Sequence, residues 1–256
     1  MQVVIPMTGL GSRFRDAGYK SLKPLIMVEG KPIIEHVINL YPNQTNFLFI
    51  VRDEHIESTP IIPTLKKTCP MGRIKVIKGH KLGPVYAVSK VYDFILDDQP
   101  VIINYCDFFM NWDYSHFKLF VESTKCDGAI PCYSGFHPHL LHETNLYASC
   151  RVNKNMELLE IKEKFSFEEN KFVAYHSSGN YYFKSGKILK KYCDKLIDNK
   201  ESLNQEYYAS LVYNNMCKDG LKTLVYDKID HFCQWGTPFD LEEYNYWSDI
   251  FIKNKI

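Results

Sequence analysis

The chain has 256 residues, of which 45% are hydrophobic, and its 31 basic and 30 acidic residues give a formal net charge of +1 at pH 7. This length and composition allow one large buried core, and the balanced charge excludes a global field that would draw the protein to nucleic acid or to an anionic membrane. No apolar run approaches the ~20 residues of a membrane-spanning helix, and the first strand is expected to begin at residue 2. We therefore expect a cytoplasmic protein with no signal peptide and no membrane partner.

The first feature along the chain is a β-branched run that leads directly into a glycine-rich turn. Residues 3–6 (VVIP) predict a buried strand, and the turn at residues 9–13 (GLGSR) follows closely. Glycines allow successive backbone N–H groups to face an anion, and Arg13 adds a planar fork of donors. This order of strand and turn indicates a phosphate-binding loop.

Two common phosphate-binding loops do not match this turn. A dinucleotide-binding loop (G-x-G-x-x-G) needs a third glycine where the chain has the bulky Phe14, and a Walker loop needs a G-K-[ST] end that does not occur. A nucleotidyltransferase loop combines glycines and Ser-Arg with a later Lys-Pro-Leu, and this chain contains all of these parts. An ordinary strand and turn with surface lysines would be the alternative without a function.

Three runs, at residues 9–13 (GLGSR), 23–25 (KPL) and 31–33 (KPI), closely resemble the opening of the sugar-phosphate nucleotidyltransferase family, also called nucleoside-diphosphate-sugar pyrophosphorylases. The resemblance implies that Arg13 and Lys23 are catalytic. It also implies a set of residues that bind the nucleotide: Met7, Thr8, Gly9, Leu10, Gly11, Ser12, Arg13, Lys23, Gly83 and Tyr105.

Apolar periodicity predicts that strands and helices alternate through the first half of the chain. Strands are expected at residues 47–51, 73–77 and 101–107, and helices at residues 32–40, 85–95 and 114–124. Gly83 ends the turn before the second of these helices. In the resembled family the matching segment lies under the nucleobase, whereas a plain strand-to-helix turn would need no ligand.

Asp107 ends the strand expected at residues 101–107. Ligands of open α/β sheets bind outside the carboxyl ends of the strands, so Asp107 should face the same crevice as the opening loop. The residue resembles the magnesium-binding aspartate of the family, and a hard oxygen ligand suits Mg²⁺. The alternative is a helix N-cap, which aspartate also favours.

The second half predicts a hairpin of strands at residues 146–152 and 156–164, then helices at 187–197 and 205–216, a strand at 221–226 and a terminal helix. Three histidines, at 137, 139 and 142, have no standard metal spacing and are expected to lie in a loop. This half resembles the acceptor-binding region of the family, although Phe165 stands where a proline usually follows the Glu-Lys pair. The implied acceptor-binding residues are Tyr147, Glu163, Lys164, Gly179 and Asn180.

Gln234 is a departure from the resembled pattern. Family members often have a second metal-binding aspartate at this place, two residues before the glycine of a Gly-Thr-Pro segment. Glutamine is neutral and binds Mg²⁺ weakly, and the nearest carboxylates along the chain are Asp230 and Asp240. The sequence leaves open whether another carboxylate replaces the family aspartate.

The expected fold is α/β: a mixed, mostly parallel Rossmann-like sheet of the GT-A type, with helices on both faces and a small β-rich acceptor lobe. We expect one domain over residues 1–256, with a nucleotide-binding part at 1–135 and an acceptor-binding part with the C-terminal helices at 136–256. The sequence leaves open whether the protein forms a homodimer. The eight scattered cysteines, which lack a C-x-x-C pair, are expected to be reduced thiols.

The expected function is the transfer of CMP from CTP to a phosphocholine- or phosphoglutamine-like acceptor with release of pyrophosphate, for capsule or surface polysaccharide modification, with Mg²⁺ as cofactor. The stretch at residues 11–19 resembles compact cytidylyltransferases. The first alternative is a sugar-1-phosphate nucleotidyltransferase that uses UTP or dTTP. The second alternative is a non-catalytic nucleotide-binding protein. A glycosyltransferase is a further alternative, but its metal site requires an Asp-x-Asp motif, which residues 107–109 (DFF) lack.

Overall fold

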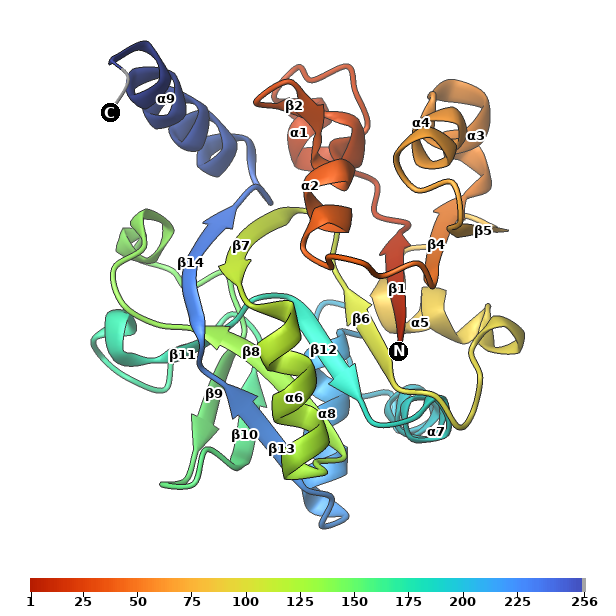
Figure 1. Ribbon diagram of the computed structural model, residues 1–256, viewed down its shortest axis with the longest axis vertical. Helices are drawn as coiled ribbons and strands as arrows, with labels where there is room; N and C mark the ends of the chain where they lie inside the picture. Colours follow the sequence, from red (N-terminus) through yellow and green to blue (C-terminus); the bar gives the residue numbers. More distant parts are fainter. Residues whose placement is uncertain (255–256) are drawn as a thin grey trace.

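The computed structural model describes residues 1–254, and its centre is a ten-stranded mixed sheet (Figure 1). The strands follow the order β10-β9-β11-β8-β12-β6-β1-β4-β5, and β13 pairs with β8 outside this path. Their bounds are β1 Gln2–Met7, β4 Phe47–Arg52, β5 Arg73–Ile77, β6 Val101–Asn104, β8 Gly128–Tyr133, β9 Ser149–Val152, β10 Leu158–Lys162, β11 Tyr175–Ser177, β12 Asn180–Phe183 and β13 Thr223–Tyr226.

Pairing divides this sheet into two halves. The strands β6, β1, β4 and β5 are parallel to one another, with Val4 level with Leu48 on one side and with Ile103 on the other. The strand β12 runs antiparallel to β6 and β8, and β11, β9 and β10 continue the antiparallel pattern. The expected α/β class is confirmed, with the parallel half first in the chain and the β-rich half second.

Helices cover both faces of the sheet because the strands are apolar on both faces. Every residue of β1 and β4 is buried, and the alternating residues Val3 and Val4 belong to two separate hydrophobic clusters. The first cluster includes residues of α2 Ile33–Asn39, α4 Ile61–Thr68 and α6 Tyr114–Thr124. The second includes residues of α5 Gly83–Ser89, α7 Gly186–Asp198 and α8 Ala209–Lys218.

Smaller elements complete the described part of the chain. The helices α1 Ser12–Asp16 and α3 Asp53–Ser58 follow β1 and β4, and 3-10 turns occur at Lys23–Leu25, Tyr92–Phe94, Pro138–Leu141 and Lys171–Val173. Two short sheets pair β2 Met27–Val28 with β3 Lys31–Pro32, and β7 Phe108–Trp112 with β14 Ile229–Gln234. The last helix, α9 Pro238–Asn254, lies at one corner of the molecule in Figure 1, where the hydroxyls of Tyr244 and Ser248 donate hydrogen bonds to Glu29 Oε1.

Several expected boundaries were wrong. The strand expected at residues 101–107 ends at Asn104, the helix expected at 85–95 breaks into α5 and a 3-10 turn, and the helix expected at 205–216 begins only at Ala209. In the last case Asn204 and Gln205 adopt positive φ angles of 52° and 66°, which a helix excludes. The pairing of β7 with β14 joins segments more than a hundred residues apart, which periodicity alone could not predict.

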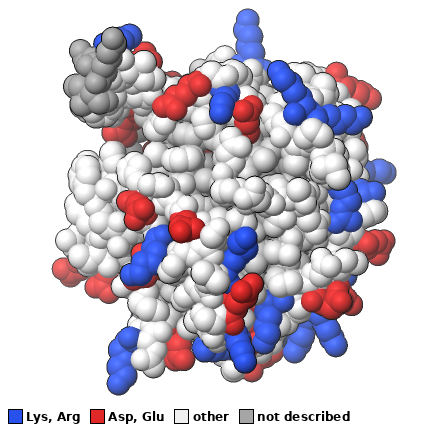
Figure 2. Space-filling view, viewed as in Figure 1, with Lys and Arg blue, Asp and Glu red and all other residues white. Residues whose placement is uncertain are grey.

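The surface and the thiols agree with the composition. Figure 2 shows Lys and Arg interspersed with Asp and Glu around a mostly uncharged middle of that face. None of the helices in the described part combines the length and apolar character needed to cross a membrane. The eight cysteines are free, as the sequence predicts.

Two of the three histidines that the sequence placed in a loop, His137 and His139, are buried beside β8 and β14, whereas His142 is partly exposed. The Nε2 atom of His139 lies 2.8 Å from the Tyr133 hydroxyl, and the Nε2 atom of His137 accepts a hydrogen bond from Phe232 N at 3.3 Å. Burial, together with a smaller contribution from the neighbouring His231 and His176, lowers the pKa of His137 to about 4 and that of His139 to about 3. Both rings are therefore neutral in the folded protein near pH 7.

This cluster predicts that acid destabilises the fold. In the unfolded chain both histidines bind protons with a pKa near ~6.5, whereas the folded protein resists protonation until about pH 4 and pH 3. The free energy of unfolding should therefore fall as the pH drops below ~6.5, by up to about 1.4 kcal/mol per pH unit for each histidine. Urea unfolding at pH 8, 7, 6 and 5 measures this loss. His116→Gln, at an exposed histidine outside this cluster, should keep the same slope, and a stability that stays constant from pH 7 to pH 5 would contradict the account.

Candidate active site

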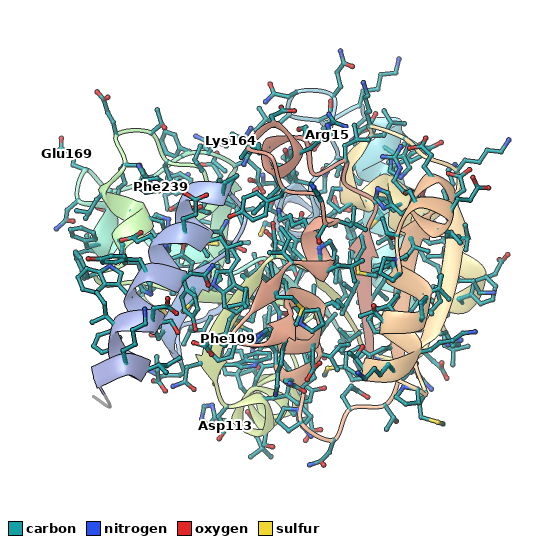
Figure 3. The ribbon with its side chains drawn as sticks, turned by 90° about the horizontal axis from the view of Figure 1, so that it is seen from above. Arg15, Phe109, Asp113, Lys164, Glu169 and Phe239 are labelled. Atoms are coloured by element: carbon teal, nitrogen blue, oxygen red, sulfur yellow. The ribbon has the colours of Figure 1, made fainter. Side chains whose placement is uncertain are left out.

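A cavity of about 780 Å³ opens at the carboxyl ends of β1 and β6. Its walls come from the turn after β1, the turn before α5, the segment after β6, the antiparallel half of the sheet, the turn before α8 and the end of β14. Arg15 and Lys164, which both line it, lie near the same edge of the molecule in Figure 3. The cavity contains all but one of the site residues expected from the sequence: Met7, Thr8, Gly9, Leu10, Gly11, Ser12, Arg13, Lys23, Gly83, Tyr105, Asp107, Tyr147, Glu163, Lys164 and Gly179.

The glycine-rich turn is held by a buried aromatic residue. Gly11 has a φ of +60° and begins α1, and Arg13 follows on that helix with an exposed side chain. Phe14, which excluded a dinucleotide-binding loop, is 2% exposed and packs against the ring of Tyr19 at 5.1 Å. Phe14 therefore fixes α1 to the core while Arg13 remains available to a ligand.

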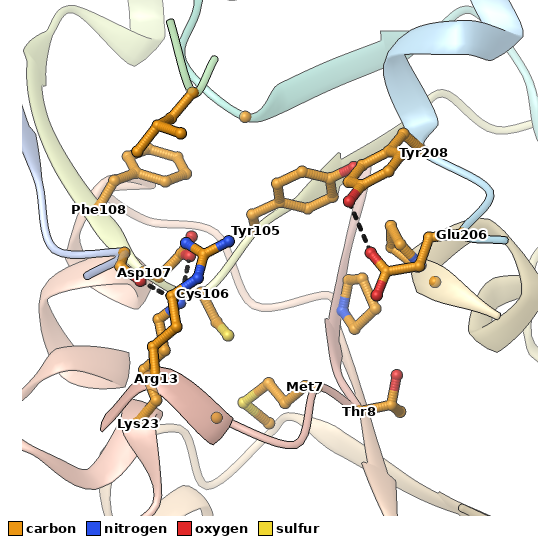
Figure 4. A pocket seen from close by; sticks show the side chains of 18 of the residues that line it. Met7, Thr8, Arg13, Lys23, Tyr105, Cys106, Asp107, Phe108, Glu206 and Tyr208 are labelled. Atoms are coloured by element: carbon orange, nitrogen blue, oxygen red, sulfur yellow. Dashed lines mark hydrogen bonds and ion pairs between the residues drawn. The ribbon is translucent and has the colours of Figure 1, made fainter. Parts of the chain in front are cut away.

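Lys23 and Asp107 form the central contact of the site. The Nζ atom of Lys23 lies 2.6 Å from Asp107 Oδ2 and also donates to the carbonyl oxygen of Gly236 at 3.3 Å. The backbone of Asp107 accepts a hydrogen bond from Trp235 N at 3.0 Å. Three distant segments of the chain therefore meet at one carboxylate, and Figure 4 shows Arg13, Lys23 and Asp107 together on one side of the cavity.

Gln234 lies beside this carboxylate. A Cβ atom on Gly236 would stand 2.4 Å from Gln234 Nε2 and 3.3 Å from Asp107 Oδ2, so the glycine leaves room for the amide between the two segments. The expected substitutes do not reach the cavity. Asp230 is exposed, and the buried Asp240 accepts a hydrogen bond from the Thr237 hydroxyl at 2.6 Å.

The donor set at this place fits a magnesium ion bound together with a polyphosphate. Asp107 supplies one carboxylate and Gln234 one amide oxygen, and Mg²⁺ commonly takes one or two carboxylates and completes its octahedron with phosphate oxygens and water. Residues 1–254 contain no group of three or more His, Cys, Asp or Glu side chains that could hold a metal by themselves. The ammonium of Lys23 is the cation next to Asp107 in the structure.

Gly83 is needed because another segment crosses it closely. Its φ is +81°, and a Cβ atom there would lie 2.8 Å from Tyr207 N. The Tyr207 backbone bonds to Leu82 O at 2.9 Å and accepts from Val85 N at 3.1 Å. These bonds place the turn before α8 over the turn before α5, and together the two turns close one end of the cavity.

The turn at residues 204–208 was missed by the sequence reasoning, which had assigned most of it to a helix. Asn204, Gln205, Glu206 and Tyr208 line the cavity, and the Tyr208 hydroxyl donates to Glu206 Oε2 at 2.6 Å. Figure 4 shows Glu206 and Tyr208 across the cavity from Arg13. Asn204 could have indicated a turn at this place, because asparagine tolerates the left-handed conformation better than most residues.

The acceptor-side residues come from the antiparallel half. Glu163 is half-buried, its Oε1 accepts a hydrogen bond from the Ser210 hydroxyl, and the loss of water around its carboxyl raises the pKa of that group. Lys164 follows with a positive φ of 53° and also lines the cavity. Gly179, with a φ of +85°, allows close packing against Tyr105 and Phe108.

Asn180 is the one expected site residue that lies outside the cavity. It is fully buried, and its Nδ2 donates to the Tyr41 hydroxyl at 2.7 Å. Tyr41 in turn donates to Asn104 Oδ1 at 2.6 Å. Alternation along a strand explains the difference, because a residue next to one that faces the cavity points the other way. Ser177 and Ser178, which belong to the run that resembles the acceptor-pocket strand but were not among the expected site residues, line the cavity.

Comparisons with known proteins relate the chain to one family. The profile of the family described as "Nucleotidyl transferase" matches residues 2–250. Among curated proteins, the bifunctional protein GlmU of Methanococcus maripaludis is 31% identical over 98 residues, which are 38% of this chain and only 23% of that protein.

Solved structures share the fold. The nucleoside-diphosphate-sugar pyrophosphorylase of Vibrio cholerae RC9 has a TM-score of 0.78 at 20% identity, over 96% of this chain and all of that one. A protein of Bacillus anthracis assigned as a glucose-1-phosphate thymidylyltransferase has a TM-score of 0.74 at 17% identity, over 96% and 94% of the two chains. HddC of Yersinia pseudotuberculosis has a TM-score of 0.61 at 20% identity, over 95% and 99%. At these identities the likeness shows the fold.

Proposed function

Because the chain belongs to the nucleotidyl transferase family, we propose that it transfers a nucleoside monophosphate from a nucleoside triphosphate to a phosphorylated small molecule and releases pyrophosphate. One observation carries the proposal: Arg13, Lys23 and Asp107 meet in the cavity that also contains Glu163 and Lys164. In such a cavity the positive charges of Arg13 and Lys23 can bind a triphosphate, and Glu163 and Lys164 can bind a second substrate.

The acceptor that we propose is a sugar 1-phosphate, with UTP or dTTP as the nucleotide. Two structural neighbours, a nucleoside-diphosphate-sugar pyrophosphorylase and a protein assigned as a glucose-1-phosphate thymidylyltransferase, favour this alternative over CTP and a phosphocholine- or phosphoglutamine-like acceptor. The use of CTP and a role in capsule modification remain predictions from the sequence alone.

The residues of the cavity would act through position and charge. The phosphate of the acceptor is already an anion near neutral pH, so the reaction needs no strong general base. Arg13 would hold the β- and γ-phosphates as the leaving pyrophosphate, Lys23 the α-phosphate, and Lys164 the acceptor phosphate. Asp107 and Gln234 would hold Mg²⁺, which offsets negative charge on the triphosphate when it is bound.

A grid of four nucleoside triphosphates against a panel of acceptors tests this proposal, with pyrophosphate release as the readout. The panel holds glucose 1-phosphate, N-acetylglucosamine 1-phosphate, phosphocholine and phosphoglutamine. We expect release only when a triphosphate and an acceptor are both present, and most strongly with a sugar 1-phosphate. Release from the triphosphate alone would contradict acceptor transfer, and strongest release with CTP and phosphocholine would favour the sequence prediction.

Asp107→Asn is predicted to abolish turnover and to leave unfolding cooperative. The variant loses the carboxylate for the metal, whereas the fold loses one ion pair and keeps the backbone hydrogen bond from Trp235 N to residue 107. Turnover and thermal unfolding of the same preparation measure both effects. Asp97→Asn, at a surface ion pair with Lys190, is the matched control. Wild-type turnover in Asp107→Asn would remove this residue from the site.

Arg13→Lys is predicted to slow turnover by about ten- to a thousandfold, as expected when a donor to the transition state is lost. The variant keeps the positive charge but loses the fork that binds two phosphate oxygens at once. Steady-state kcat is the measurement, and Arg151→Lys, at an exposed side chain of β9, is the control. If kcat were unchanged and only the melting temperature fell, Arg13 would serve the fold.

Gln234→Asp is predicted to raise the magnesium concentration needed for half-maximal rate. With one carboxylate and an amide, the wild-type protein should bind Mg²⁺ weakly alone and strongly with nucleotide, because triphosphate oxygens complete the coordination. A second carboxylate repels the triphosphate until more metal neutralises it. Calorimetric titration of Mg²⁺ into the wild-type protein, with and without nucleotide, measures whether metal binding depends on the nucleotide. A tight stoichiometric site in the nucleotide-free protein would show that another carboxylate completes a preformed centre.

A further inference from the structure

Arg52 is a buried arginine at the end of β4, away from the cavity lining. It is 4% exposed, and β4 lies between β1 and β5 in the parallel half of the sheet (Figure 1). Val51 is level with Met7 on one side, and Arg52 is level with Ile77 on the other. The turns that follow β1 and β5 both line the cavity, so Arg52 stands between them at the end of the middle strand.

The guanidinium contacts the first of these turns directly. Its Nη1 atom donates a hydrogen bond to the carbonyl oxygen of Thr8 at 3.2 Å. Thr8 precedes Gly9 in the glycine-rich turn and lines the cavity. Arg52 therefore holds the backbone of the turn from behind, on the side opposite to the ligand space.

The same guanidinium packs against the second turn. A Cβ atom on Gly79 would lie only 2.3 Å from Arg52 Nη2, so this turn touches the guanidinium through a residue without a side chain. The neighbouring Asp53 accepts a hydrogen bond from Gly79 N at 3.1 Å, which fixes the backbone in this place. The turn continues through His80 and Lys81 to Gly83, all of which line the cavity.

Burial of this charge is only partly compensated. Arg52 Nη2 pairs with Glu54 Oε2 at 2.8 Å, but the Glu54 side chain is 63% exposed, and Arg52 Nε has no hydrogen-bond partner within residues 1–254. A buried charge with incomplete pairing contributes little to stability, and an apolar side chain of similar volume is often tolerated or stabilising. A purely structural role would therefore be served as well by methionine.

We propose that Arg52 is a positioning residue that sets the spacing of the two turns around the nucleotide. One planar guanidinium presents donors in two directions, so it can hold Thr8 on one side and support Gly79 on the other, which a lysine ammonium cannot do with the same geometry. The inference rests on the proposed function, because it assigns the two turns to a nucleoside triphosphate. It concerns nucleotide binding and leaves acceptor binding unchanged.

Arg52→Met tests the inference through binding. Calorimetry with the α,β-methylene analogue of the triphosphate that the wild-type protein turns over fastest should show a dissociation constant about ten- to a hundredfold higher, since small misplacements of positioning groups have effects of this size. The melting temperature and the KM for the acceptor should stay at their wild-type values. Arg52→Lys should be intermediate. Arg73→Met, an exposed arginine of β5 that bonds to Asn46 Oδ1, should bind like wild type.

Gly79→Ala provides a second and independent variant. Its methyl group would meet Arg52 Nη2 and displace the guanidinium from Thr8 without removing the charge, so it should weaken binding of the analogue in the wild-type background. In the Arg52→Met background the same change should add little, because the two residues act through one contact. Full additivity of the two changes, or unchanged binding in Arg52→Met, would overturn the inference. Failure of the wild-type protein to bind any triphosphate analogue would instead refute the proposed function.

Discussion

The 2.6 Å ion pair between Lys23 and Asp107 is the contact around which the rest of the site is arranged. Lys23 comes from a 3-10 turn near the start of the chain, Asp107 follows the strand β6, and the carbonyl of Gly236 from beyond β14 joins the same ammonium. Along the chain Lys23 is 84 residues from Asp107 and 213 residues from Gly236, so only the folded protein brings these groups together. The parallel strands β1 and β6 end at one edge of the sheet, which brings the segments that carry Lys23 and Asp107 together, and the pairing of β14 with β7 adds Gly236.

Much of this arrangement was predictable because it has a local cause. The local sequence predicts the first strand from its β-branched run, the turn from its two glycines, and the position of the aspartate from the apolar strand before it. Because ligands of open α/β sheets bind outside the carboxyl ends of the strands, these features are expected to lie together. Phe14 was correctly taken as a mark against a dinucleotide loop, and the structure gives the reason, since its ring is an anchor in the core. The resemblance to known transferases added the acceptor side, and four of its five residues line the cavity.

The features that the sequence did not predict depend on contacts between segments that are far apart in the chain. The turn at residues 204–208 depends on backbone bonds to Leu82, and the pairing of β14 with β7 brings Gln234 to Asp107, and neither leaves a periodic pattern in the sequence. Asn180 was misplaced by one step of strand alternation, because a one-residue error exchanges the two faces of a strand. Arg52 gave no signal at all, since its importance lies in being level with the ends of two neighbouring strands.

The central claim is that the bond between the α- and β-phosphates of a nucleoside triphosphate is broken and its α-phosphate is joined to the acceptor. Phosphorus NMR of a reaction with the preferred pair of substrates observes the bonds themselves. The account predicts equal amounts of pyrophosphate and of a new phosphoanhydride that links the nucleoside monophosphate to the acceptor. Orthophosphate together with a nucleoside diphosphate, and no new phosphoanhydride, would contradict it.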